Sequence, residues 1–255
     1  MTHSPLLVER SGAVAHLRFN RPEVLNALDV DLAHALLEAC HSLAGDSAVR
    51  VVVLAGNGRA FMAGGDLAAM RAAPVEAADV LIRPLHQAVQ LLAEMPQPVL
   101  ASVHGAAAGA GMSLVLGADL AIAAEGTRFS FAYTDIATNC DGGASWALPR
   151  LLGLRKALEI ALLAEPFDAA EALRLGLVNR VIAPESLAEA TAELAECLAE
   201  RAPHALASLK RLLRSSLHHS LAEQLQLEHE GFLDCAGRPE FVTAIDAFYS
   251  RRKRG

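Results

Sequence analysis

Apolar runs and segments of helical spacing alternate along the first two thirds of the chain. Two short apolar segments, Leu6–Glu9 and Ala13–Phe19, flank Ser11-Gly12, and this pattern predicts a β-hairpin. Longer apolar runs with β-branched residues predict buried strands, at Val49–Ala55, Pro98–Val103, Asp119–Ala124 and Leu177–Ile182. Helical spacing predicts helices between these strands, at Asp29–Ala44 with Asp29 as N-cap, Val75–Glu94, Gly109–Leu116 and Pro166–Gly176.

The last quarter of the chain has a different pattern. From Pro184 to Arg251 the spacing is almost entirely helical, with breaks near Pro203, Ser220 and Pro239. We find no internal repeat and no flexible linker. The pattern predicts an α/β core, residues 1–195, followed by a helical C-terminal segment, residues 196–255.

Composition and charge narrow the class of protein. Apolar residues make up 53% of the chain and charged residues 20%, which is typical of a globular protein. The net charge of −7 argues against nucleic acid as a partner. The four cysteines are scattered without a CxxC pair, and the N-terminus has no signal-peptide pattern, so we expect reduced thiols in a cytoplasmic protein. Polar residues and glycines interrupt the apolar run Pro98–Ala124, so no membrane span is expected.

Two segments share an arrangement that is suited to binding an anion. The strand Val49–Ala55 leads into Ala63-Gly64-Gly65-Asp66, and Pro98–Val103 leads into a second run of small residues, Gly105–Gly111. Small residues let a ligand approach the main chain, and N–H groups at a helix start have no intrahelical acceptor. Two converging donors would form an oxyanion hole. The alternative is that the small residues only allow tight packing of helix on sheet.

An ordered set of motifs resembles the crotonase (enoyl-CoA hydratase/isomerase) family over nearly the whole chain. The motifs are Asn20-Arg21-Pro22, Asn26-Ala27-Leu28, Gly58–Leu67, Val103–Gly111, Asp141-Gly142-Gly143, Leu148-Pro149-Arg150 and Ala247–Arg252. The resemblance implies a spiral core of repeated ββα units and a helical C-terminal trimerisation segment. It also implies an acyl-CoA substrate and a homotrimer or homohexamer.

By this resemblance, the oxyanion donors are the main-chain N–H groups of Gly65 and Ala110. Further positions are expected to contact the substrate: Ala27, Ala63 and Leu67 against the adenine and pantetheine parts of coenzyme A, together with Gly64, Asp66, Ser113 and Tyr133. Asp66 is expected to cap the following helix.

The proton-transfer positions distinguish between the reactions of the family. Family hydratases use two glutamates, and the resemblance places Ser113 and Tyr133 at those positions. Neither is a good base at neutral pH, so hydration by the usual pair is not expected. Asp141 lies where several isomerases carry their acidic base, and one carboxylate suffices to move a double bond. The alternative is that Asp141 caps a helix starting near Ala144, and Asp135 is a second candidate base.

The sequence therefore predicts an enoyl-CoA isomerase that stabilises a thioester enolate. A hydratase or another crotonase-family lyase is one alternative, and a non-catalytic acyl-CoA-binding protein is another. Neither a metal nor a redox cofactor is expected, because coenzyme A enters as part of the substrate. Trp146 is expected to pack in the core or to form part of the acyl pocket wall.

Overall fold

A six-stranded sheet forms the centre of the protein. The computed structural model describes residues 4–71 and 73–252. The strands lie in the order β1-β2-β3-β4-β6-β9. Strands β1 and β2 form an antiparallel hairpin and the others join in parallel. Their bounds are β1 Leu6–Ser11, β2 Val14–Phe19, β3 Val51–Gly56, β4 Val99–Val103, β6 Leu120–Ala124 and β9 Arg180–Ile182.

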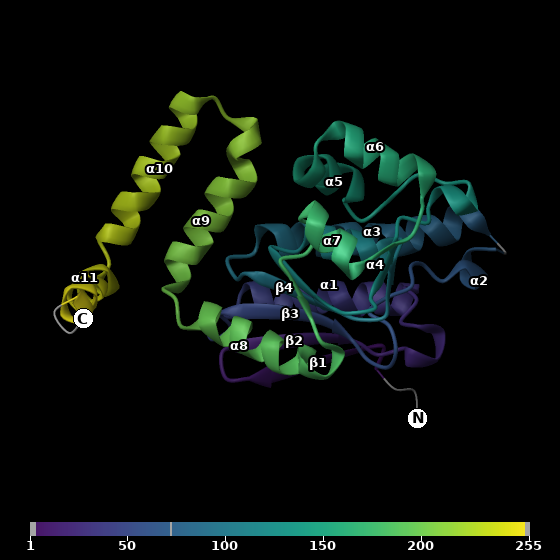
Figure 1. The fold of residues 1–255 in the computed structure, drawn as a ribbon, viewed down its shortest axis with the longest axis horizontal. Coiled ribbons are helices and arrows are strands. Elements are labelled where there is room, and N and C mark those ends of the chain that lie inside the picture. Colours follow the sequence, from purple (N-terminus) through teal and green to yellow (C-terminus); the bar gives the residue numbers. More distant parts are fainter. Residues whose placement is uncertain (1–3, 72, 253–255) are drawn as a thin grey trace.

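Helices cover both faces of this sheet (Figure 1). On one face of the sheet, helices α1 (Val30–Ala44), α3 (Pro74–Glu94) and α4 (Ala110–Gly117) form the larger apolar core. On the other face, α8 (Leu187–Ala199) forms the smaller one. In β3, Val51 and Val53 face α8, whereas Val52 and Leu54 face the larger core. This explains the continuous apolar run, because successive residues of a strand point to opposite faces.

A second, three-stranded sheet and the shorter helices complete the core. Its strands lie in the order β5-β7-β8. The remaining core elements are β5 Ala106–Ala108, β7 Arg128–Ser130, β8 Phe167–Asp168, α2 Leu67–Met70, α5 Ala144–Leu152, α6 Leu154–Leu163 and α7 Ala169–Leu175. Among the residues described, no helix combines the length and apolar character needed to cross a membrane.

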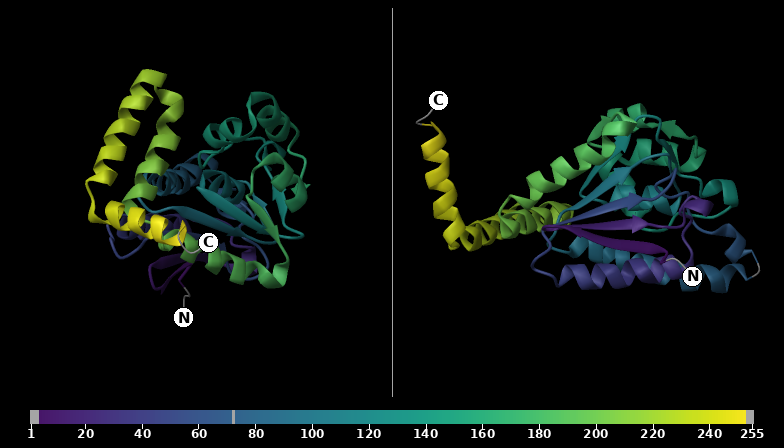
Figure 2. Two further views of the ribbon diagram at one scale, coloured as in Figure 1. Left: turned by 60° about the vertical axis from the view of Figure 1, so that its left-hand side comes forward. Right: turned by 90° about the horizontal axis from the view of Figure 1, so that it is seen from below.

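The C-terminal helices form an arm that extends away from the sheet (Figure 2). The arm comprises α9 (Pro203–Ser215), α10 (Leu221–Ala236) and α11 (Pro239–Arg252). Lys210 attaches it to the core, because its ammonium group contacts Asp119 Oδ2 at 2.8 Å and donates to Leu92 O and Gln97 O at 2.8 and 2.9 Å. Burial lowers the pKa of Lys210, and the charge of Asp119 opposes that effect. Arg214 holds the other carboxylate oxygen of Asp119 at 2.7 Å.

Most elements expected from the sequence are present, and the differences have local causes. Asp29 caps α1 by accepting from Leu32 N at 2.8 Å, as predicted. The helix predicted from Pro166 instead begins after β8, because Asp168 caps α7 by accepting from Glu171 N at 2.9 Å. The predicted strand Leu177–Ile182 pairs only over β9. The expected boundary after residue 195 falls within α8, which packs on the sheet.

Candidate functional site

The two loops rich in small residues lie against each other. Met62 and Ala107 form a parallel β-bridge, in which Met62 N donates to Ala106 O at 3.0 Å and Ala108 N donates to Met62 O at 2.9 Å. Gly65 and Ala110 each lie three residues beyond this bridge: Gly65 precedes the N-cap position of α2, and Ala110 is the first residue of α4. The fold therefore brings together the two segments that the sequence singled out.

A glycine with positive φ precedes each predicted donor. Gly64 has φ +108° and Gly109 has φ +49°, conformations that L side chains rarely adopt. A Cβ built on Gly109 would lie 3.5 Å from Gly64 Cα, so the two turns are in contact. Leu28 and Gly65 form a parallel β-bridge, in which Leu28 N donates to Gly64 O and Asp66 N donates to Leu28 O. In such a bridge the N–H of Gly65 points away from Leu28. Within the described part of the chain, neither Gly65 N nor Ala110 N has a hydrogen-bond acceptor.

A third loop, residues 25–28, packs against the first of these turns. Ala63 N donates to Leu25 O at 3.1 Å, and Leu28 N donates to Gly64 O at 2.8 Å. Ala27, Ala63 and Leu67, which the resemblance assigns to coenzyme A, therefore lie on neighbouring segments, and Leu67 is 49% exposed.

Asp66 has a different role from the one expected. It stands at the N-cap position of α2, but its side chain makes no capping hydrogen bond. Its carboxylate instead pairs with Arg21 at 3.2 Å, and the same guanidinium contacts Asp29 at 2.9 Å and donates to Ala27 O. The capping prediction was wrong because this shared guanidinium binds the carboxylate of Asp66.

Ser113, Tyr133 and Asp141 form one hydrogen-bonded chain. The phenol of Tyr133 donates to Asp141 Oδ1 at 2.5 Å, and Ser113 Oγ lies 2.9 Å from the phenol oxygen. Ser113 and Tyr133 are buried, whereas Asp141 is partly exposed. Burial and the nearby charge of Asp141 raise the pKa of Tyr133 far above its usual value, so the phenol stays protonated. The two residues that the resemblance places at the hydratase glutamate positions, Ser113 and Tyr133, thus carry hydroxyls that are linked to a single carboxylate.

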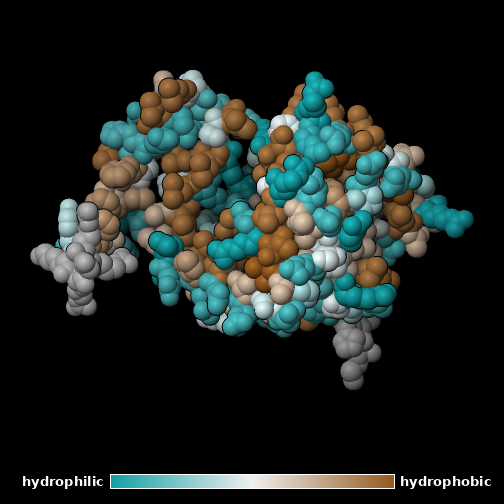
Figure 3. All heavy atoms as spheres, in the orientation of Figure 1, coloured by the Kyte–Doolittle hydropathy of each residue, from teal (hydrophilic) through white to brown (hydrophobic). Residues whose placement is uncertain are grey.

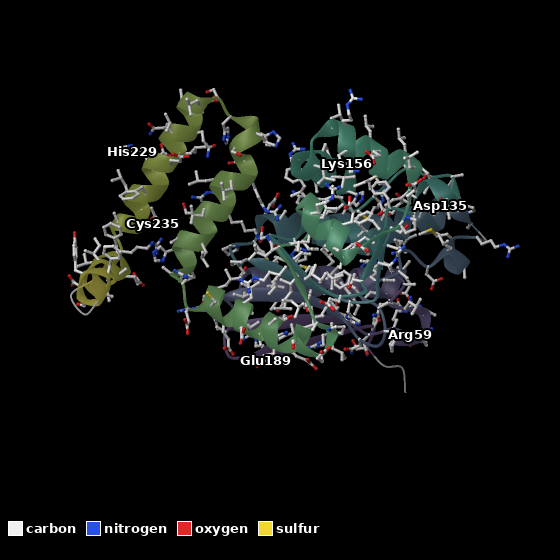
Figure 4. All side chains as sticks on the ribbon, viewed as in Figure 1. Arg59, Asp135, Lys156, Glu189, His229 and Cys235 are labelled. Carbon is white, nitrogen blue, oxygen red and sulfur yellow. The ribbon has the colours of Figure 1, made fainter. Side chains whose placement is uncertain are left out.

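Asp141 does not cap the following helix. Gly143 is the N-cap of α5 and has no side-chain capping bond. The side chain of Asp141 faces Tyr133 instead, which removes the capping alternative. Asp135, the second candidate base, is exposed, and Figure 4 places it at the end of the core away from the arm.

A cavity of about 490 Å³ opens beside Asp141. We call it the α3–α5 cavity, because α3, α5 and the segment just before α5 together supply most of its wall. Its apolar wall includes Val89, Leu92 and Leu114, and Cys140 and Trp146 also line it. Arg214 of α9 borders it on the side of the arm, where Figure 3 shows a hollow between the arm and the core. Trp146 thus lies in the wall of this cavity.

The predicted donors lie close to this cavity, but they do not line it. Ala110 and Leu114 are one helical turn apart on the same face of α4, and Leu114 is in the cavity wall. A Cβ built on Gly142 would lie 2.9 Å from Ser113 Cβ, so the segment carrying Asp141 packs on the first turns of α4.

Sequence reasoning missed His86. It lies on α3, lines the same cavity as Asp141, and its Nε2 accepts a hydrogen bond from Gly142 N at 3.1 Å. This bond places the ring proton of a neutral His86 on Nδ1. No motif surrounds His86 in the sequence, and only the packing of α3 beside residue 142 reveals its position. The cavity therefore carries an imidazole in addition to the carboxylate of Asp141.

Comparison with known proteins identifies the family. The family model described as enoyl-CoA hydratase/isomerase matches residues 9–254. The chain belongs to the enoyl-CoA hydratase/isomerase family. It is 35% identical to a probable enoyl-CoA hydratase from Rhodobacter capsulatus, over 99% of this chain and 97% of that protein. It is 34% identical to the 1,2-epoxyphenylacetyl-CoA isomerase of Escherichia coli, over 94% and 93% of the two chains.

A solved structure of the family confirms the fold. The enoyl-CoA hydratase from Bacillus anthracis superimposes with a TM-score of 0.93 at 28% identity, covering 97% of this chain and 96% of that one. The crotonase-like α/β fold expected from the motifs is thereby confirmed. The names of the relatives include both a hydratase and an isomerase, so family membership leaves the reaction open.

Proposed function

We propose that this protein is an enoyl-CoA isomerase that moves a double bond along an acyl chain through a thioester enolate. One observation carries the proposal: the two positions expected for hydratase glutamates hold hydroxyls, and their hydrogen bonds lead to Asp141. A reaction that needs one base fits this arrangement, whereas hydration by a pair of glutamates does not.

In the proposed mechanism the thioester oxygen accepts hydrogen bonds from Gly65 N–H and Ala110 N–H. Asp141 removes a proton from an acyl carbon, and the electron pair of the broken C–H bond moves into a dienolate. The two donors stabilise the developing negative charge on oxygen, and each such donor is worth about 3–4 kcal/mol in other enzymes. Asp141 then returns the proton to a different carbon, which shifts the double bond.

The cavity and the loops around the predicted donors are suited to binding the two halves of an acyl-CoA substrate. The acyl chain would extend into the α3–α5 cavity, whose wall is largely apolar. The loops carrying Ala27, Ala63 and Leu67 would contact coenzyme A, which enters as part of the substrate. The mechanism uses neither a metal nor a redox cofactor, and we propose that the enzyme acts in the cytoplasm.

A second candidate is hydration or another lyase reaction. It is favoured by the position of His86, which lines the same cavity as Asp141. Such a reaction needs one group to activate water and another to manage the α-proton. Asp141 and His86 lie on the same cavity and would supply the two groups.

Replacing Asp141 by Asn tests the isomerase. We expect Asp141→Asn to lower kcat by about 100-fold with little change in acyl-CoA affinity, because the amide cannot accept the proton. The assay compares positional isomers of enoyl-CoA with crotonyl-CoA hydration, and it identifies the products. Asp135→Asn is the matched control, because Asp135 is exposed and lies outside the cavity.

Each outcome of this assay separates the candidates. Undiminished isomerase turnover in Asp141→Asn would exclude Asp141 as the base. Hydration lost in both Asp141→Asn and His86→Gln would favour the second candidate. Binding of acyl-CoA without turnover of any enoyl isomer would identify a non-catalytic binding protein.

We also propose that the protein is a homotrimer or homohexamer assembled through its arm. Large apolar side chains of the arm remain exposed in the single chain: Leu209, Leu213, Leu217, Leu221, Leu225, Phe232 and Leu233. An exposed surface that carries this many large apolar side chains is typical of an interface between protein chains.

A further inference from the structure

The hydrogen-bond chain that ends on Asp141 has a defined direction. Each hydroxyl has one proton to donate. Tyr133 gives its proton to the Asp141 carboxylate at 2.5 Å, so the 2.9 Å contact with Ser113 requires Ser113 to donate to the phenol oxygen. The contact of Ser113 Oγ with Gly109 O is longer, at 3.2 Å. The protons therefore point from Ser113 through Tyr133 towards Asp141.

The two oxygens of Asp141 are left in different surroundings. Oδ1 accepts the phenol proton, whereas no group in the described part of the chain bonds to Oδ2. The next residue, Gly142, has φ +58°, packs against Ser113 and donates its N–H to His86. The segment is thus held on both sides, and one carboxylate oxygen remains available to a ligand in the α3–α5 cavity.

We propose that Tyr133, supported by Ser113, is the positioning residue for Asp141: its phenol holds Oδ1 so that Oδ2 is the oxygen that exchanges a proton with the substrate. This inference rests on the proposed isomerase function. It changes the role expected for Ser113 and Tyr133, which the sequence assigned to direct contact with the substrate. In the inferred role they act through the carboxylate of Asp141.

The phenol of Tyr133 should affect the pH dependence of turnover. A hydrogen bond donated to a carboxylate favours its ionised form. Removing the phenol hydroxyl therefore makes the base easier to protonate, and the acidic limb of the pH profile moves to higher pH. The other charged or titratable groups on this cavity are His86, Glu94, Cys140 and Arg214. These groups are identical in the wild type and in a variant that lacks only the phenol hydroxyl, so a comparison of the two pH profiles isolates the effect of that hydroxyl.

Tyr133→Phe is the decisive variant, because it removes the hydroxyl and keeps the ring that packs edge-on against Phe131. We expect the midpoint of the acidic limb of kcat/KM to rise by about one pH unit and kcat to fall by about tenfold, with KM nearly unchanged. Tyr249→Phe is the matched control: Tyr249 lies on α11, is 59% exposed and is the other tyrosine of the chain.

Ser113→Ala provides an independent readout if Tyr133→Phe fails to fold. It removes the hydroxyl that donates to the phenol and lies 3.2 Å from Gly109 O, but it leaves the phenol on Asp141, so we expect a smaller shift of the acidic limb in the same direction. An unmoved acidic limb in the folded Tyr133→Phe protein would overturn the inference. A large rise in KM without a shift would also overturn it, because Tyr133 would then contact the substrate directly.

Failure of this inference can be told apart from failure of the proposed function. If Asp141→Asn abolishes isomerisation but Tyr133→Phe behaves like the wild type, Asp141 remains the base and only the positioning role is lost. If Asp141→Asn retains full turnover, the proposed function itself fails.

Discussion

A single buried amide, that of Asn26, connects the loop of residues 25–28 to the segment that leads into the first of the two turns. Its Nδ2 donates to Ala60 O at 2.8 Å and Asn57 O at 2.9 Å, and it also lies 3.2 Å from Phe61 O. Its Oδ1 accepts from Arg21 N at 2.9 Å. Asn26 also has φ +57°, a conformation that Asn tolerates better than most residues. Asn26 therefore fixes the segment that leads to Gly65.

We expect Asn26→Ala to lower the free energy of unfolding by about 2–4 kcal/mol, because it leaves buried carbonyl groups without donors. Chemical denaturation followed by circular dichroism measures the change. Asn57→Ala is the control, since the side chain of Asn57 makes one hydrogen bond, to Asn20. A loss of under about 1 kcal/mol in Asn26→Ala would show that water replaces the amide.

The sequence assigned most residues of the candidate site but not how they meet. Ser113, Tyr133 and Asp141 were each assigned by position, and the sequence assigned no contact between them. Such contacts depend on where α4 and the segment before α5 are packed, which local patterns do not encode. His86 shows the same limit, because one histidine on a helix face resembles any solvated residue.

At the scale of elements, the approach of α4 to the first loop depends on the absence of a side chain at Gly111. A Cβ at this position would lie 2.3 Å from Met62 O and 2.8 Å from Met62 Cβ. The helix and loop would have to separate, and the bridge between Met62 and Ala107 would be strained. Sequence periodicity located the long helices and strands well. The three-residue strands β5 and β7 were not predicted, because segments so short carry no periodic signal.

We expect Gly111→Ala to lower kcat by about 100-fold, because separating α4 from the first loop would move the two proposed main-chain donors apart. The free energy of unfolding should fall by about 1–3 kcal/mol through overpacking. Gly45→Ala is the control: Gly45 follows α1, has φ −87°, and a Cβ there would meet nothing within 4 Å. Steady-state kinetics and denaturation measure both effects, and full activity in Gly111→Ala would contradict the requirement for close approach.

At the scale of the whole molecule, the arm has a polar attachment and an apolar surface. Asp119, Lys210 and Arg214 connect it to the core through ion pairs, and Lys210 is almost fully buried. Five leucines of α9 and α10 are exposed, namely Leu209, Leu213, Leu221, Leu225 and Leu233, and Figure 3 shows apolar residues on the surface of the arm. The sequence predicted the helices and breaks of this segment correctly. It gave no sign that they would leave the core, because helical spacing does not specify the partner of a helix.

We expect the wild-type protein to run as a trimer or hexamer of the 26.9 kDa chain in size-exclusion chromatography with light scattering. Leu213→Asp combined with Leu217→Asp should reduce the mass towards that of one chain, because each chain would bring two added charges, six in a trimer, to an apolar interface. These leucines are 71% and 68% exposed in the single chain. Val75→Asp is the control, since Val75 is 78% exposed but lies on α3. A wild-type protein that runs as a monomer would contradict the proposed assembly.

The glycines at positions 64 and 109 have an evolutionary consequence. They orient the peptide groups of Gly65 and Ala110, and replacing the side chain at either position leaves its N–H group in place. In contrast, every group proposed to take part in proton transfer is a side chain. Mutation can therefore alter residues 86, 113, 133 and 141 while the backbone continues to present the same two N–H groups. Divergence on such a scaffold would change the reaction more readily than the kind of molecule on which it acts.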